Sequence, residues 1–234
     1  MFRQSFSFFL VSILLIAVLL CAAGCETRDV AGIPRLQQEA CEYVLLIAID
    51  CSGSFRDYMT VEGKGFEFVQ FALDKYFGDR IGGNNDQIVI TQLSGSRPLL
   101  WQGTPQELRR DFPNANAFRD YVLAHADQQG GSRLNLGVAE SLDYVLSTYS
   151  VAQGNAKTVA LICSDMLDNH PDPEASEQRF IDALTRYARR GAIGFYFCDQ
   201  TKLADIRRKT EQAGFRWVII EPEFHGRPQM PNFD

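Results

Sequence analysis

An apolar run of seven residues, Tyr43–Ile49, leads directly into Asp50-Cys51-Ser52-Gly53-Ser54. A short run with so few polar residues is typical of a strand that is buried on both faces of a parallel α/β sheet. Ligands of such sheets gather at the carboxyl ends of the strands, where these five residues are expected to lie. One carboxylate and two hydroxyls form an all-oxygen donor set. This set suits Mg²⁺ or Mn²⁺ better than a metal that prefers thiolates.

Further along the chain, segments with strand and helix character alternate. This predicts an α/β fold with a doubly wound, mostly parallel six-stranded sheet and helices on both faces. The second and third strands are separated only by Ser94–Arg97, which is too short for a parallel crossover, so they should form an antiparallel hairpin at the sheet edge. We expect strands at 42–50, 87–93, 98–102, 158–163, 193–198 and 217–220, and helices at 63–77, 105–111, 115–127, 136–148, 173–190 and 202–212.

The first 24 residues have the pattern of a secretory signal, with Arg3 before an apolar run over 8–23. The small residues before Cys25 resemble the cleavage box of bacterial lipoproteins, although Ala22 stands where leucine is usual. The resemblance implies cleavage before Cys25, lipid attachment to Cys25, and a place in the bacterial cell envelope outside the cytoplasm (periplasmic in a Gram-negative cell). A plain signal peptide and a retained anchor are the alternatives. Residues 25–40 would then form a tether, 41–221 the folded domain and 222–234 an irregular tail.

The net charge of the whole chain is −6. Removal of residues 1–24 takes away Arg3 and no acidic residue, so the mature chain is one unit more negative. An acidic protein is not expected to have nucleic acid or an anionic membrane surface as its main partner.

Four cysteines follow Cys25, and none of them forms a C-x-x-C pair, so zinc-ribbon and thioredoxin folds have no support. Disulfides are permitted outside the cytoplasm, and three of these cysteines fall near strand ends, where a bridge is geometrically allowed. Buried free thiols are the preferred interpretation. The four are Cys41, Cys51, Cys163 and Cys198.

Two further loops carry oxygen ligands. Ser132 lies in a Gly-Gly-Ser-Arg segment shortly before a predicted helix, and Asp165 follows the strand predicted at 158–163. If the sheet forms as expected, both residues can meet Asp50, Ser52 and Ser54 at its carboxyl edge. Each residue alone has an ordinary explanation, as a helix cap or a turn residue. Asp168 could supply an additional carboxylate, but a solvated turn residue is the preferred interpretation.

Together these residues resemble the metal-ion-dependent adhesion site of the von Willebrand factor A domain family, over roughly residues 41–221. The family pattern has D-x-S-x-S after the first strand, a threonine in a glycine-flanked loop, and an aspartate after the fourth strand. This chain has Ser132 where threonine is usual. The resemblance implies that Ser52, Ser54 and Ser132 touch Mg²⁺ or Mn²⁺ directly. It also implies that Asp50 and Asp165 act largely through bound water, and that a Glu or Asp of a protein partner completes the site.

The sequence therefore predicts a non-enzymatic, membrane-tethered module that binds a protein partner through a divalent metal. The face expected to select that partner consists of Phe55, Arg56, Arg133, Met166 and His170, with Tyr58 beside them. A metal-free scaffold with the same fold is the alternative. A redox or hydrolytic enzyme is the less favoured class, since the histidines at 125, 170 and 225 form no recognisable nucleophile–base set and no G-x-S-x-G motif occurs.

Overall fold

The computed structural model describes residues 41–53, 55–60, 63–79, 83–95, 97–126, 133–149, 151, 154–223 and 226–233. All of these residues belong to one compact unit, Glu39–Asp234. The predicted signal segment, Cys25 and the predicted tether lie outside the described residues. Within the described part of the chain, no helix combines the length and the apolar character needed to cross a membrane.

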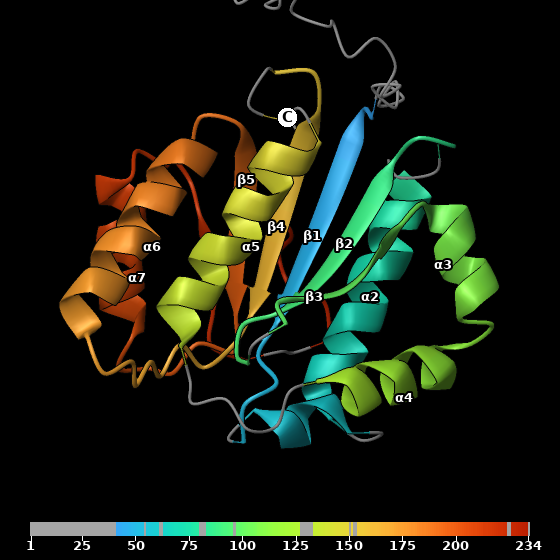
Figure 1. Cartoon of the computed structure of the whole chain (residues 1–234), viewed down its shortest axis with the longest axis horizontal. Helices are drawn as coiled ribbons and strands as arrows, with labels where there is room; N and C mark the ends of the chain where they lie inside the picture. Colours follow the sequence, from blue (N-terminus) through green and yellow to red (C-terminus); the bar gives the residue numbers. More distant parts are fainter. Residues whose placement is uncertain are drawn as a thin grey trace, which may run out of the picture. The chain divides into compact units, whose positions relative to one another are not determined.

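A six-stranded sheet forms the centre of this unit, in the order β3-β2-β1-β4-β5-β6 (Figure 1). Every neighbouring pair is parallel except β2 and β3, which are antiparallel. The predicted fold class, including the single antiparallel edge strand, is confirmed. The strands are β1 (Tyr43–Ile49), β2 (Gln87–Gln92), β3 (Leu99–Gly103), β4 (Lys157–Cys163), β5 (Gly191–Tyr196) and β6 (Ile219–Glu221).

Helices cover both faces of the sheet, as the alternating pattern predicts. On one face, α2 (Lys64–Asp79), α3 (Pro105–Asp111) and α4 (Ala115–His125) bury side chains against alternate residues of β1 and β4. On the other face, α5 (Leu134–Thr148), α6 (Pro173–Tyr187) and α7 (Leu203–Gln212) cover the intervening residues. The two central strands are therefore buried on both sides, which explains why their sequences are apolar without alternation. A short 3₁₀ helix, η1 (Arg56–Met59), follows β1.

The C-terminal tail contains no helix or strand over its described residues 226–233, yet it is held firmly against the α2 face. The Tyr76 hydroxyl donates to the Pro231 carbonyl at 2.6 Å, and Phe233 makes edge-on ring contacts with Tyr43 and Tyr76. Both Met230 and Phe233 are buried in the core. The tail thus supplies apolar cover that this face of the sheet would otherwise lack.

Several element boundaries differ from those expected. The helix predicted at 136–148 begins two residues earlier, at Leu134, because the Leu134 N–H is capped by Asp168. The helix predicted at 173–190 ends at Tyr187, and a turn over 188–190 leads into β5, which also begins earlier than expected. The last strand contains only Ile219–Glu221, and Trp217 lies exposed before it.

Candidate metal site

Asp50 is completely buried at the carboxyl end of β1, and the chain around it is held in place by hydrogen bonds. Its own N–H donates to the Cys163 carbonyl at 2.8 Å, which brings the end of β1 against the end of β4. One carboxylate oxygen, Oδ1, accepts the Ser52 N–H at 2.8 Å, and Oδ2 accepts the Ser164 hydroxyl at 2.9 Å. The carboxylate is therefore fixed between the two central strands.

Burial raises the pKa of the Asp50 carboxyl above its ordinary value, because the charged form is poorly solvated. The Ser52 and Ser164 donors oppose this shift, while the negative charge of Asp165 adds to it. Two carboxylates thus lie close enough to repel each other. A cation between them would remove the repulsion and favour the ionised form of Asp50.

The Ser52 hydroxyl lies beside this carboxylate and is itself buried, with its residue only 7% exposed. It lies near enough to Asp50 to favour the ionised carboxylate. However, it makes no hydrogen bond of normal geometry with any described residue. A buried hydroxyl without a partner carries an energetic cost. A hard cation such as Mg²⁺ or Mn²⁺ would remove that cost by accepting the hydroxyl as a ligand. The residues present therefore fit the metal that the sequence predicts.

The loop after β4 places Asp165 at the same edge of the sheet. The Asp165 Oδ1 accepts the Leu167 N–H at 2.9 Å, and the Asp165 carbonyl accepts the Asp199 N–H at 3.0 Å. Met166, which lies between Asp165 and Leu167 in the chain, has a positive φ of 59°, which is uncommon for a residue with a side chain. Ser164 supports the loop from below, since its Oγ accepts the Met166 N–H at 2.9 Å while its hydroxyl donates to Asp50.

Ser164 belongs to the candidate site, although the sequence did not single it out. It links the Asp50 carboxylate to the loop that carries Asp165, so it couples the positions of the two acidic groups. The only available signal was its place directly before Asp165, at the end of a buried strand.

Asp168 is the second residue with an unexpected role. Its Oδ1 accepts the Leu134 N–H at 2.9 Å, and its Oδ2 accepts from the Asn135 side chain at 2.8 Å and the Ser176 hydroxyl at 3.1 Å. The preference for a solvated turn residue is wrong. Asp168 instead joins the loop after β4 to the first turns of α5 and α6.

The first turn of α5 is also held against the end of β2. A Cβ on Gly137 would lie 2.0 Å from the Leu93 carbonyl oxygen, so only glycine permits this approach. The amino end of α5 therefore lies at the same sheet edge as Asp50 and Asp165. Ser132 precedes this end by two residues, but Ser132 and Ser54 both lie outside the described residues.

The face expected to select a partner requires correction. Phe55 is fully buried, stacked on Tyr58 and packed edge-on against Phe197, and Met166 is also buried. Both are apolar side chains directly beside the core, which explains why they turn inward. The exposed apolar side chains here are Tyr58 and Leu167, each 42% exposed.

The polar members of that predicted face have their own contacts. The Arg133 guanidinium donates to the Gly95 carbonyl at 3.2 Å, which ties the start of α5 to the β2–β3 turn. His170 Nδ1 lies 2.8 Å from the Asp172 carbonyl oxygen, at the approach to α6. Arg56 is the first residue of η1, and the structure describes its backbone but not its side chain.

The four described cysteines are buried free thiols, as the preferred interpretation held. Burial raises the pKa of the Cys51 and Cys198 thiols to about 12 and that of Cys41 to about 11. Such thiols are poor nucleophiles at neutral pH. Cys51 thus contributes to packing below the site and not to its donor set.

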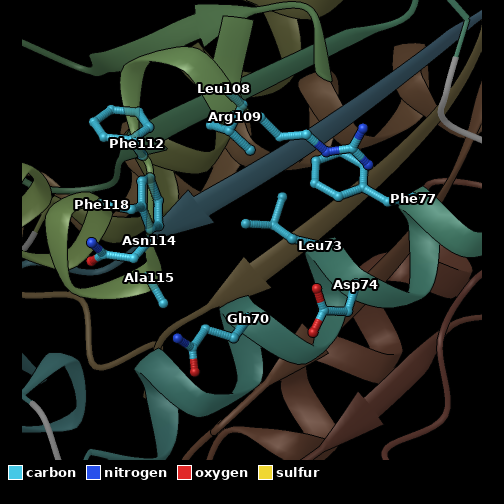
Figure 2. A pocket seen from close by; sticks show the side chains of 10 residues that line it. All are labelled: Gln70, Leu73, Asp74, Phe77, Leu108, Arg109, Phe112, Asn114, Ala115 and Phe118. Atoms are coloured by element: carbon cyan, nitrogen blue, oxygen red, sulfur yellow. The ribbon is translucent and has the colours of Figure 1, made fainter. Parts of the chain in front are cut away.

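In the part of the chain that the structure describes, no three His, Cys, Asp or Glu side chains gather as a metal site. The candidate donor set is instead made of two carboxylates with hydroxyls. A separate hollow of about 420 Å³ lies between α2 and α3–α4, lined by both apolar and polar side chains, with Arg109 over the Phe77 ring (Figure 2). None of the candidate metal ligands lines this hollow.

No family model matches the sequence, and no curated protein matches it. Solved structures with a similar fold include a von Willebrand factor type A protein from Catenulispora acidiphila, with 14% identity and a TM-score of 0.47. Two structures of proximal thread matrix protein 1 from the mussel byssus have 12% and 13% identity and TM-scores of 0.43 and 0.45. The second of these has a zinc-occupied MIDAS motif.

Each of these similarities covers 77% of this chain, and the chain spans only 38% to 43% of the length of those structures. Identities and TM-scores this low do not support any inference about ligands or partners. The fold class rests on the observed sheet order, which is that of a six-stranded, doubly wound α/β sheet, and acidic and hydroxyl side chains gather at its carboxyl edge.

Proposed function

We propose that this protein is a non-enzymatic binding module that takes a divalent metal at the carboxyl edge of β1 and β4. The observation that carries this proposal is the buried Ser52 hydroxyl, which lacks a hydrogen-bond partner among the described residues beside a buried, constrained Asp50 carboxylate. Ser52 would hold the ion together with Asp50 and Asp165, and Ser54 and Ser132 would complete the set. Mg²⁺ or Mn²⁺ suits these ligands.

When bound, the ion supplies a positive charge that can take a carboxylate from a protein partner. Few of the residues would touch the ion with a full negative charge, so it would stay electrophilic. Tyr58 and Leu167 would add exposed apolar contacts around that carboxylate. The predicted lipid on Cys25 would hold the module to a membrane of the bacterial cell envelope, outside the cytoplasm.

Metal binding can be tested by adding Mg²⁺ or Mn²⁺ to EDTA-treated protein and following the melting temperature. At a concentration one hundred times the dissociation constant, binding stabilises the folded state by about 2.7 kcal/mol. For a folded unit of this size, that corresponds to a rise of roughly 5–10 °C.

Ser52→Ala gives the sharpest comparison. It removes a buried hydroxyl that makes no hydrogen bond of normal geometry with a described residue, so the metal-free variant should melt at or slightly above the wild-type temperature. The rise on adding metal should disappear. Ser147→Ala, on the exposed side of α5, is the matched control and should keep the full rise.

An equal rise in wild type and Ser52→Ala would exclude this site as the place where metal binds. No rise in the wild type would support the alternative, a metal-free scaffold with the same fold. The partner step is tested by capture from envelope extracts in Mg²⁺ and in EDTA, with wild type and Ser52→Ala as baits. A protein retained equally under all four conditions does not use the metal.

A further inference from the structure

Basic residues gather at the amino ends of β4, β5 and β6, which is the end of the sheet opposite to the candidate metal site. Lys157 is the first residue of β4, Arg189 and Arg190 directly precede β5, and Arg216 lies shortly before β6. Because β4, β5 and β6 are neighbouring parallel strands, their starts lie side by side. We call Lys157, Arg189, Arg190, Arg216 and the adjacent Trp217 the basic edge.

The strand register places these residues at similar positions along the direction of the strands. Thr158 is opposite Gly191, so Lys157 lies level with Arg190. Gly194 is opposite Ile219, which brings Trp217 level with Ala192, one residue beyond the start of β5. A hollow of about 310 Å³ lies between them, lined by Arg189, Arg190, Trp217 and the tail residue Asn232 among others.

The four cations of the basic edge make no ion pair with any described residue. Some arginines elsewhere are paired: Arg179 and Arg186 with Asp143, and Arg208 with Glu177 and Asp205. The acidic residue Glu42 is the backbone neighbour of Lys157, since its backbone carbonyl accepts the Lys157 N–H at 2.9 Å. In a chain with a net charge of −6, this is a local concentration of unpaired positive charge.

Trp217 is 60% exposed, the most exposed of the large hydrophobic side chains that the structure describes. An exposed tryptophan flanked by arginines matches the chemistry of a lipid headgroup layer. The indole ring favours the boundary between water and acyl chains, and guanidinium groups bind phosphate oxygens.

The direction of the chain adds a further reason. The described chain starts at Cys41, immediately before β1, and Tyr43 is opposite Lys157. The basic edge is therefore the end of the domain that residues 1–40 lead into. A lipid on Cys25 would bring this end close to the bilayer.

We propose that the basic edge rests on anionic phospholipid headgroups, so that the candidate metal site points away from the membrane. This inference deepens the proposed function and uses its membrane tether. The tether keeps the domain near the bilayer, and the basic edge sets its orientation. Removal of one arginine should weaken this contact about fivefold, as expected for a basic residue at an anionic surface.

The test uses the full chain reconstituted with vesicles of phosphatidylcholine, with or without phosphatidylglycerol, in which the phosphatidylcholine carries brominated acyl chains. Bromine quenches a tryptophan only at short range, so quenching reports whether Trp217 touches the bilayer. Trp217→Phe leaves only Trp101 and supplies the background. We expect strong quenching of Trp217 with phosphatidylglycerol, weak quenching without it, and a loss of quenching at high salt.

The variant Arg189→Gln with Arg190→Gln should lose most of the quenching. Lys64→Gln with Arg97→Gln makes the same charge change at exposed positions of the opposite edge and should keep it. Equal quenching in the two double variants would overturn the proposal, and so would quenching of the same strength with and without phosphatidylglycerol. So would a Trp217 fluorescence change caused by inorganic phosphate alone, without lipid quenching, since that would assign the arginines to a free anion.

Flotation separates this inference from the tether. A chain that floats with phosphatidylcholine vesicles but shows no phosphatidylglycerol-dependent quenching retains its tether and refutes the basic edge. A chain that floats only when phosphatidylglycerol is present, with Trp217 quenched, supports the basic edge and refutes the lipid tether.

Discussion

Removal of the Asp168 carboxylate tests how the loop after β4 is joined to α5. Asp168→Ala deletes the acceptor for the Leu134 N–H, the Asn135 side chain and the Ser176 hydroxyl. Loss of a capping acceptor costs about 1 kcal/mol. Loss of a partly buried negative charge at a helix amino terminus costs about 0.5–1 kcal/mol more. The buried Ser176 hydroxyl left without its acceptor adds about 1 kcal/mol.

The free energy of unfolding should therefore fall by about 2–3 kcal/mol, measured by urea denaturation. In a folded unit of this size, the melting temperature should fall by roughly 5–10 °C. Asp168→Asn keeps one acceptor oxygen and should cost about half as much. Because α5 carries Ser132 just before its first turn, the stabilisation by added metal should also shrink in Asp168→Ala.

Asp172→Ala is the matched control. Asp172 caps α6 through a single bond to the Ala175 N–H at 3.1 Å and is exposed, so its removal should cost only about 1 kcal/mol and leave the effect of metal unchanged. If Asp168→Ala cost no more than Asp172→Ala, the three hydrogen bonds of Asp168 would not be acting together, and the role assigned to it would be refuted.

Three further outcomes are expected. Burial raises the pKa of Asp50, so the metal-free protein should lose stability as pH rises from about 4, the ordinary value for Asp, through that raised pKa. Asp50→Asn should flatten this part of the pH profile in EDTA, and an unchanged slope would contradict it. Burial raises the pKa of the Cys51 and Cys198 thiols to about 12, so neither should react with a thiol reagent until the protein unfolds. Rapid labelling of either in the folded protein would show that it is accessible. Phe233→Ala should cost about 3 kcal/mol of unfolding free energy, whereas Asn232→Ala should change it by less than about 0.5 kcal/mol; similar values for the two would show that the tail does not contribute to the core.

Much of the fold could be predicted because local patterns report on burial. An unbroken apolar run such as Tyr43–Ile49 is compatible with a strand covered on both faces. The four-residue link Ser94–Arg97 allows only an antiparallel pair. The acidic and hydroxyl residues after β1 and β4 could likewise be placed at one edge, because parallel strands end together.

The support around the site could not be predicted in the same way. Ser164 and Asp168 are ordinary residues for a loop, and their roles depend on which groups face them across the sheet edge. The inward orientation of Phe55 and Met166 has the same origin. A polar residue directly precedes each of them in sequence, but their neighbours in space are the aromatic and aliphatic side chains of the core.

The sequence by itself determined the doubly wound α/β architecture and the donor types of the candidate metal site. Both follow from the order of apolar and polar residues along single segments. Only the tertiary structure decided that Asp168 joins α5 to the loop after β4 and that the tail is part of the core. It alone also brought Lys157, Arg189, Arg190 and Arg216 together on a chain whose overall charge is negative. The physical reason is that hydrogen bonds and charges act through space, between residues that lie far apart in the chain.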